Sequence, residues 1–317
     1  MYRYTVTVPQ HAPRATLAVY VRHAFSLLPE SALRSAFLAR DVKMNGVRCN
    51  GETMVRPGAE ITIFTPCRAE LPVIFENERL LAIDKPAGIS CDADAYGSIT
   101  VLDWARMHAA GAYEPRMCHR LDNRTSGLTV LAKDDQTERA LLNMFASHAG
   151  NKTYACLVRG TPEPARARRV AWLRKDARRA RVQILQREAA GAKPIETVYQ
   201  VMRSGPVSLL RVTLLTGRTH QIRAHMAALG HPVLGDDQYG DREFNRKWGN
   251  GALMLRSVEL TLQTQGEILD IDGITLRVPN GLDKVLDNIV QKSKINTEEE
   301  KREKREKRYH SPDRFRY

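Results

Sequence analysis

The middle of this chain carries one carboxylate among basic and hydroxyl side chains, directly before an apolar run. Residues 119–128 read HRLDNRTSGL and lead into the apolar residues 128–132, which places Asp122 near the edge of a predicted strand. A second run, GRTHQIRAH at residues 217–225, is dense in hydrogen-bond donors and nearly free of acceptors. Together the two runs predict a site in which a single aspartate lies beside arginine and a polyanionic substrate binds. Taken alone, an Arg–Asp pair is more often a structural salt bridge than a catalytic site.

The charge balance favours a nucleic-acid partner. The chain has 317 residues, with 49 Lys and Arg against 36 Asp and Glu, a formal net charge of +13. A soluble protein this basic usually binds a polyanion, and nucleic acid is the first candidate. The length and the 43% hydrophobic content allow one large domain beside a small one.

The cysteines and the apolar runs bear on the cellular compartment of the protein. Five cysteines are scattered without a CxxC pair, which predicts reduced thiols rather than a disulfide scaffold or a zinc site. The N-terminus lacks the apolar core of a signal peptide, and no apolar run approaches membrane-spanning length. We therefore expect a cytoplasmic monomer with no membrane partner.

The first 68 residues predict a small α+β unit. Residues 1–10 alternate as a short strand, and apolar residues at helical spacing follow from Pro13. Ser31 is placed to cap a second helix. The run VKMNGVRCNG at residues 42–51 carries Asn-Gly twice, a strong hairpin signal, and residues 57–63 add a turn and a strand.

Short β-rich runs alternate with a few helices over residues 69–290. We expect strands at 73–75 and 80–83, and helices at 136–149 and 219–229. This pattern suits an α+β domain built on a mixed, mainly antiparallel sheet.

Two stretches stand out by their charge. Residues 161–193 are rich in arginine, which fits either a basic loop over the site or a solvated hairpin. Residues 291–317 differ in kind from the rest, since residues 298–308 are almost wholly charged, and we expect a disordered tail or a fraying helix there. Either a nonspecific RNA-binding arm or a plain solvated tail would have this composition.

Six motifs resemble those of the RluA-type RNA pseudouridine synthases, the family of the RluC- and RluD-like enzymes. The family signatures HRLDxxTSGL, GRTHQIRxH and GHPxxGDxxYG match residues 119–128, 217–225 and 230–240, and DKPAG, KTYAC and ETVY begin at residues 84, 152 and 196. The resemblance covers about residues 70–290. The chain departs from the family after KPAG and at residues 255–257, and both departures concern the choice of substrate.

The resemblance implies roles for the site residues. Asp122 would be the catalytic aspartate, and Arg223 the cation that keeps its carboxylate ionised away from water. Tyr154 would stack on the uracil and assist the proton transfer that leaves C5. Arg120 would fill the space left by a flipped uridine, and Lys85 would contact phosphate or cap its strand.

The N-terminal unit is similar to the S4 RNA-binding module in the order of its elements. This likeness implies phosphate contacts from Arg34, Arg40 and Lys43, although isolated arginines more often lie on a solvated helix face. Within the family an S4 module goes more often with large-subunit rRNA than with tRNA. The favoured partner is therefore rRNA, with tRNA as the alternative.

No cofactor is expected, because isomerising uridine adds no external group. The chain carries no Walker loop, no GxGxxG and no cluster of metal ligands. A noncatalytic RNA-binding factor of ribosome assembly is the second hypothesis; loss of Asp122 or Arg223 would have marked it, and both are present. A glycoside hydrolase would need paired carboxylates, and the motif offers one.

Overall fold

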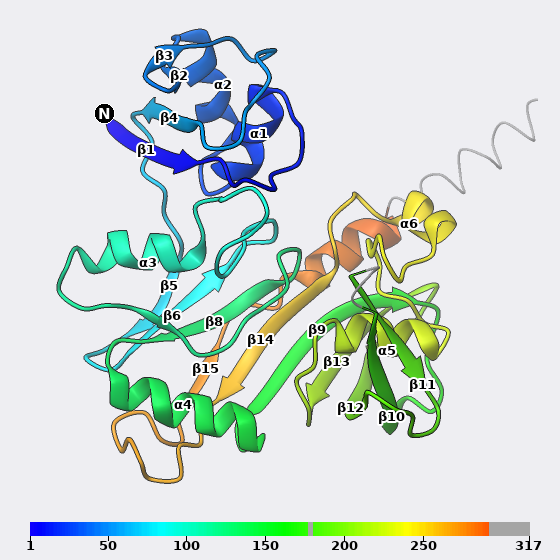
Figure 1. Ribbon diagram of the computed structural model, residues 1–317. Coiled ribbons are helices and arrows are strands. Elements are labelled where there is room, and N and C mark those ends of the chain that lie inside the picture. Colours follow the sequence, from blue (N-terminus) through cyan, green and yellow to red (C-terminus); the bar gives the residue numbers. More distant parts are fainter. Residues whose placement is uncertain (177–179, 292–317) are drawn as a thin grey trace, which may run out of the picture.

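The computed structural model describes residues 1–176 and 180–291, and within them the chain forms two β-sheets with helices beside them (Figure 1). A four-stranded sheet lies in the N-terminal part and an eleven-stranded sheet in the rest. In the large sheet every pairing is antiparallel except that of β14 (Leu255–Thr261) with β8 (Ser126–Ala132). The expected mixed, mainly antiparallel α+β fold is confirmed.

The N-terminal sheet has the order β1-β4-β2-β3 and packs with two helices. Asn45 and Gly46 both have positive φ, 50° and 78°, and join the second and third strands as the predicted tight hairpin turn. The elements are β1 (Tyr2–Thr7), α1 (Leu17–Ala24), α2 (Glu30–Leu38), β2 (Val42–Met44), β3 (Val47–Arg48) and β4 (Glu60–Thr65).

The expected cap of the second helix is wrong. Pro29 is the N-cap of α2, and no side chain caps it, whereas Ser31 lies inside the first turn. The proline ring fixes φ at −59°, and its ψ of 144° is extended, so the helical conformation begins only at Glu30.

The large sheet runs in the order β11-β10-β12-β13-β9-β14-β8-β6-β5, with β15 beside β14 and β7 beside β8. Its remaining elements are β5 (Val73–Glu76), β6 (Leu80–Lys85), α3 (Val101–Ala109), β7 (Arg116–Met117), α4 (Asp135–Ser147), β9 (Asn151–Arg159), β10 (Arg166–Asp176), β11 (Arg181–Leu185), β12 (Ala192–Arg203), β13 (Val207–Leu214), α5 (Gln221–Ala228), α6 (Arg242–Trp248) and β15 (Thr275–Arg277). The arginine-rich stretch forms the hairpin β10–β11 at one edge; Arg178, Arg179 and all but the first residue of the expected tail lie outside the described residues.

The two units share one apolar core. Side chains of α1, such as Tyr20, belong to the same buried cluster as Ile83, Ile99 and Trp104. The Tyr20 hydroxyl donates to the Tyr96 carbonyl oxygen at 2.5 Å, and the His23 ring stacks on the Tyr96 ring at 4.4 Å between centroids. The small unit is therefore docked on the segment that follows β6.

Gly127 is the second residue of the central strand β8, which begins directly after the HRLDNRT loop. Its φ is +110°, and a Cβ there would lie 2.1 Å from the carbonyl oxygen of Ser257 on β14. A side chain at this position would push apart the one parallel strand pair of the described sheet.

We predict that Gly127→Ala lowers the free energy of unfolding by roughly 2–5 kcal/mol, because backbone strain and overpacking add at this site. Gly273→Ala is the matched control, since Gly273 also has positive φ but nothing within 4 Å of the new Cβ. The control should cost only about 1–2 kcal/mol. Denaturant titration measures both, and equal losses would contradict the strand-contact explanation.

Candidate active site

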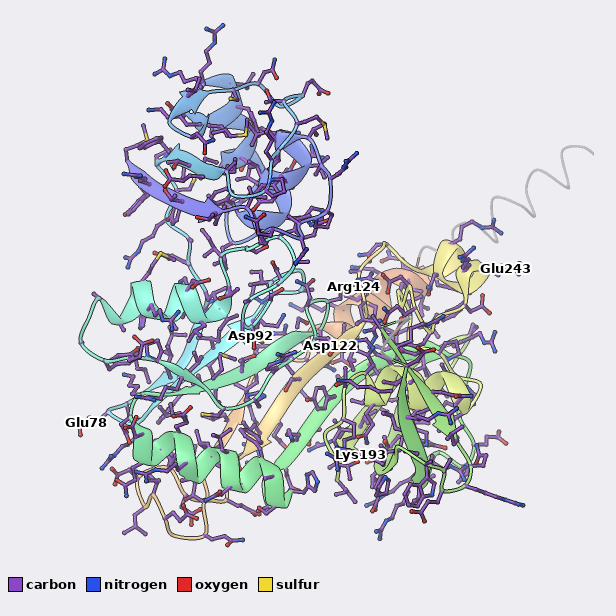
Figure 2. All side chains as sticks on the ribbon, in the orientation of Figure 1. Glu78, Asp92, Asp122, Arg124, Lys193 and Glu243 are labelled. Atoms are coloured by element: carbon purple, nitrogen blue, oxygen red, sulfur yellow. The ribbon has the colours of Figure 1, made fainter. Side chains whose placement is uncertain are left out.

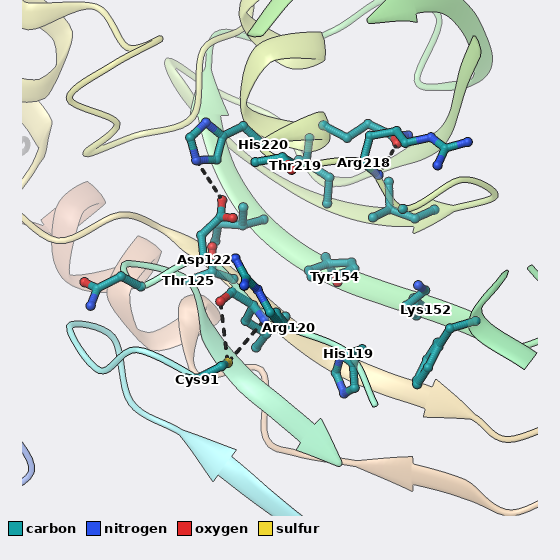
Figure 3. A pocket seen from close by; sticks show the side chains of 18 of the residues that line it. Cys91, His119, Arg120, Asp122, Thr125, Lys152, Tyr154, Arg218, Thr219 and His220 are labelled. Atoms are coloured by element: carbon teal, nitrogen blue, oxygen red, sulfur yellow. Dashed lines mark hydrogen bonds and ion pairs between the residues drawn. The ribbon is translucent and has the colours of Figure 1, made fainter. Parts of the chain in front are cut away.

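A cavity of about 710 Å³ opens between β9, the HRLD loop, helix α4 and the start of α5 (Figure 3). Asp122, Arg223, Tyr154 and Arg120 all line this cavity, although they come from three separate parts of the sequence. In the view of Figure 2, Asp122 lies near the middle of the large unit, whereas Glu78 lies at its periphery.

Asp122 faces two nitrogen-bearing side chains of the GRTHQIRAH run. Its Oδ2 lies 3.4 Å from Nη1 of Arg223 and 3.7 Å from Nε2 of His220. The Asp122 side chain is 26% exposed and that of Arg223 only 5%, so the carboxylate can meet a ligand while its cation is shielded from water. Such shielding strengthens the attraction between the two charges.

Arg223 makes its two-pronged contact with Asp236 rather than with Asp122. Its Nε and Nη2 donate to the two Asp236 carboxylate oxygens at 2.7 and 2.9 Å, and only Nη1 remains for Asp122. Asp236 also accepts the backbone N–H groups of Gln238 and Tyr239. A buried carboxylate with this many donors holds the guanidinium in one orientation.

The pKa values agree with this ion pair. Burial favours the neutral form of both groups, but the hydrogen bonds from Arg223 hold the pKa of Asp236 below its usual value. The same contact raises the pKa of Arg223 against the effect of its burial. Both groups are therefore charged at neutral pH.

Tyr154 lies on β9 and is buried, with its ring on the wall of the cavity. Burial, and then the charge of Asp122, raise the pKa of Tyr154. The hydroxyl therefore keeps its proton at neutral pH, so Tyr154 cannot act as a ready phenolate base.

His220 is a site residue that sequence reasoning missed. It is the N-cap of α5 with φ +54°, an uncommon backbone conformation for a non-glycine residue. Its Nδ1 lies 3.0 Å from the Tyr239 hydroxyl, which accepts the Val182 N–H, and burial lowers the pKa of His220. The neutral tautomer that satisfies both neighbours accepts from Tyr239 at Nδ1 and turns Nε2–H toward Asp122. In the sequence, only the position of His220 inside the GRTHQIR run could have indicated that it belongs to the site.

Arg120 lies at the rim of the cavity. Its side chain is 69% exposed, and its Nη1 pairs with the Asp92 carboxylate at 3.0 Å. An exposed ion pair of this kind contributes little to stability, so Arg120 can leave it readily.

Lys85 is not available to RNA phosphate, contrary to one of the two expected roles. Its side chain is fully buried, and Nζ donates to the carbonyl oxygens of Pro86, Ile89 and Asn123. Burial lowers the pKa of Lys85 to about 8. The ammonium instead ties the KPAG turn to the residue after Asp122.

Arg124 and His119 fix the HRLD loop from its two ends. Arg124 donates to the carbonyl oxygens of Gly235 and Gly251 and pairs with Asp237 at 2.7 Å. Nε2 of His119 accepts the Val130 N–H at 3.0 Å, and burial lowers the pKa of His119 to about 3. His119 is thus a neutral acceptor that supports the loop.

The described residues contain no group of three or more His, Cys, Asp or Glu side chains placed to hold a metal ion. In the same part of the chain, no helix combines the length and the apolar character needed to cross a membrane.

The chain is similar to known proteins of one family. A family model described as RNA pseudouridylate synthase matches residues 79–228. Ribosomal large subunit pseudouridine synthase C of Salmonella typhi is 30% identical over 247 residues, which cover 72% of this chain and 77% of that protein. Synthase D of Zymomonas mobilis is 34% identical over 179 residues, 54% of this chain and 56% of that protein. An uncharacterized homologue of Mycoplasma pneumoniae is 32% identical, with 61% of its length matched.

A solved structure has the same fold. Human RNA pseudouridylate synthase domain containing 1 superposes with a TM-score of 0.56 at 26% identity, covering 68% of this chain and 86% of that one. The chain therefore belongs to the RNA pseudouridine synthase family, as its motifs predicted. The alignments with the Zymomonas and Mycoplasma relatives span less than two thirds of those proteins.

We predict that Asp236→Asn lowers the free energy of unfolding at neutral pH by about 3–5 kcal/mol, because it leaves the buried Arg223 charge without its main partner. The matched control is Asp237→Asn, whose side chain is 62% exposed and should cost at most about 1 kcal/mol.

The difference between wild type and Asp236→Asn should also depend on pH. Because the pKa of Asp236 is lowered in the fold, its stabilisation is complete above the ordinary aspartate pKa of about 3.9 and is lost as pH falls through the folded value. Urea titrations across acid pH measure this, and a difference that stayed constant or grew would contradict the account.

Proposed function

We propose that this protein isomerises uridine to pseudouridine in RNA, with large-subunit ribosomal RNA as its substrate and tRNA as the alternative. The observation that carries the proposal is the Asp122 carboxylate, which faces the cavity beside a buried arginine in a chain of this family. The Salmonella and Zymomonas relatives are named for the large ribosomal subunit, which favours rRNA.

The reaction breaks the bond between C1′ and N1, turns the base and joins C1′ to C5. The C5 proton leaves and N1 gains a proton, so no external group enters the product. Asp122 acts either as a nucleophile at C1′ or as a base that generates a glycal, and both routes need it ionised. The Arg223 guanidinium lies 3.4 Å from the Asp122 carboxylate and complements its negative charge.

Tyr154 stacks on the uracil in this proposal. Since its hydroxyl keeps its proton, it contributes as a hydrogen-bond donor or as part of a proton relay rather than as a phenolate. A target uridine must leave its helix stack to reach this cavity. Arg120, exposed at the rim and held only by Asp92, can swing into the vacated space as a planar cation.

We further propose that residues 1–68 form an S4-like RNA-binding domain, that 69–290 form the catalytic domain, and that the protein is a monomer. Three cations of the small unit are available to phosphate. Arg34 is 73% exposed beside Glu30, Arg40 is exposed just after α2, and the Lys43 ammonium lies 5.1 Å from the Phe64 ring centroid. The cytoplasmic location stays a prediction.

Asp122→Asn should abolish pseudouridine formation while RNA affinity changes little, because the carboxylate reacts and does little anchoring. The measurement is pseudouridine content of unmodified rRNA and tRNA transcripts after incubation with purified protein. Asp92→Asn is the control, since this neighbouring carboxylate lies at the rim and pairs with Arg120. It should keep measurable turnover, and turnover by Asp122→Asn would refute the assignment.

Arg40→Gln and Lys43→Gln should each flatten the dependence of log affinity on log salt concentration by about 0.7–0.9, the value for one lost phosphate contact. Arg3→Gln, on the first strand and 62% exposed, is the matched control with an unchanged slope. Point substitutions suit this test better than deletion, because the small unit shares its core with the catalytic domain. Unchanged slopes for both variants would show that this face does not touch RNA.

A further inference from the structure

The cavity has two electrically different ends. At one end Asp122 and Arg223 line the cavity, and Arg223 pairs with both Asp122 and the buried Asp236. At the other end Lys152 and Arg218 also line the cavity, and neither has an ion-pair partner among the residues that the structure describes. In Figure 3, Tyr154 lies between Asp122 and Lys152.

We propose that Lys152 and Arg218 form a phosphate subsite, which holds a phosphodiester of the RNA strand next to the uridine that reaches Asp122. The inference rests on the proposed function and adds to it the position of the backbone contact.

The Lys152 side chain packs against neighbouring residues rather than extending into solvent. It lies on β9 two residues before Tyr154, so both side chains point to the same face of the sheet. Its Nζ lies 4.8 Å from the Phe145 ring centroid and 3.0 Å from where a Cβ at Gly217 would be. Gly217 therefore leaves room for the ammonium group.

Arg218 comes from the loop that enters α5. Its backbone N–H donates to Oε1 of the buried Gln221 at 3.1 Å, which fixes the loop. The Nε atom of Arg218 is buried and has no hydrogen-bond partner among the described residues. A buried donor without an acceptor is costly, and a bound anion would satisfy it.

The charges of Lys152 and Arg218 both affect the pKa of one neighbouring histidine. Burial, then the charge of Lys152 and then that of Arg218, lower the pKa of His148 at the end of α4. Burial alone lowers the pKa of Lys152, with no carboxylate opposing it. Taking cations out of water without a counter-charge is unfavourable, so the site is suited to an anionic ligand. The strand step of about 3.3–3.4 Å per residue places Lys152 nearly 7 Å along from Tyr154, within reach of the backbone beside a stacked base.

The test is the salt dependence of binding to a short single-stranded oligouridylate, measured by fluorescence anisotropy. Lys152→Met and Arg218→Met keep the aliphatic bulk and remove the charge. Each should lower the slope of log affinity against log salt by about 0.7, the value for one phosphate contact on a single strand. Lys152→Arg should restore the wild-type slope.

Lys284→Met is the matched control. Lys284 is exposed on the helical segment 282–291, whose apolar side packs on Ala155 and Leu157, the opposite face of β9 from Tyr154. Wild-type slopes for both Lys152→Met and Arg218→Met would overturn the subsite, even if either variant melted at a lower temperature. A lower slope for Arg218→Met alone would also overturn it as drawn, because the proposal requires both cations.

The outcome is separable from the test of the proposed function. Pseudouridine formation by wild type together with unchanged slopes would keep the enzyme and discard the subsite. Lowered slopes without isomerisation of any RNA would keep an RNA-binding subsite and discard the enzyme.

Discussion

The buried two-pronged ion pair between Arg223 and Asp236 fixes the charge that faces Asp122. A guanidinium that contacted only Asp122 could rotate away, since a single contact at 3.4 Å is weak. Asp236 removes that freedom by taking two nitrogens and by being itself anchored on two backbone N–H groups. The cation is thus in place before any substrate arrives, as catalysis by a preorganised environment requires.

The sheet brings the three parts of the site together. β8 follows the HRLD loop, β9 carries Tyr154 and Lys152, and β14 lies between these two strands (Figure 1). Arg124 adds a tie from the HRLD loop to the carbonyl of Gly235, next to Asp236. The loop with the carboxylate and the segment that anchors its arginine are therefore tied to each other. The docked N-terminal unit contacts the segment after β6, whose residues 90–94 form part of the same cavity wall.

The sequence could predict what depends on local chemistry. The Asn45–Gly46 pair predicted the hairpin from sequence, and both residues adopt positive φ in the turn. The buried residues of α4 likewise recur at helical spacing in the sequence. It could not predict that Arg223 prefers Asp236, thirteen residues away, because this contact depends on how the loop after α5 folds back. The sequence also could not predict that the Lys85 ammonium is buried, because its three acceptors are backbone carbonyl oxygens, which any residue type supplies.

The central claim is that this chain modifies uridine in RNA through Asp122. The most direct measurement is a map of pseudouridines in the RNA of cells that lack the chain, complemented either with the wild-type chain or with Asp122→Asn. The account predicts at least one position in large-subunit rRNA that is modified only when the wild-type chain is present. Identical maps for the two complemented strains, in rRNA and tRNA alike, would contradict it.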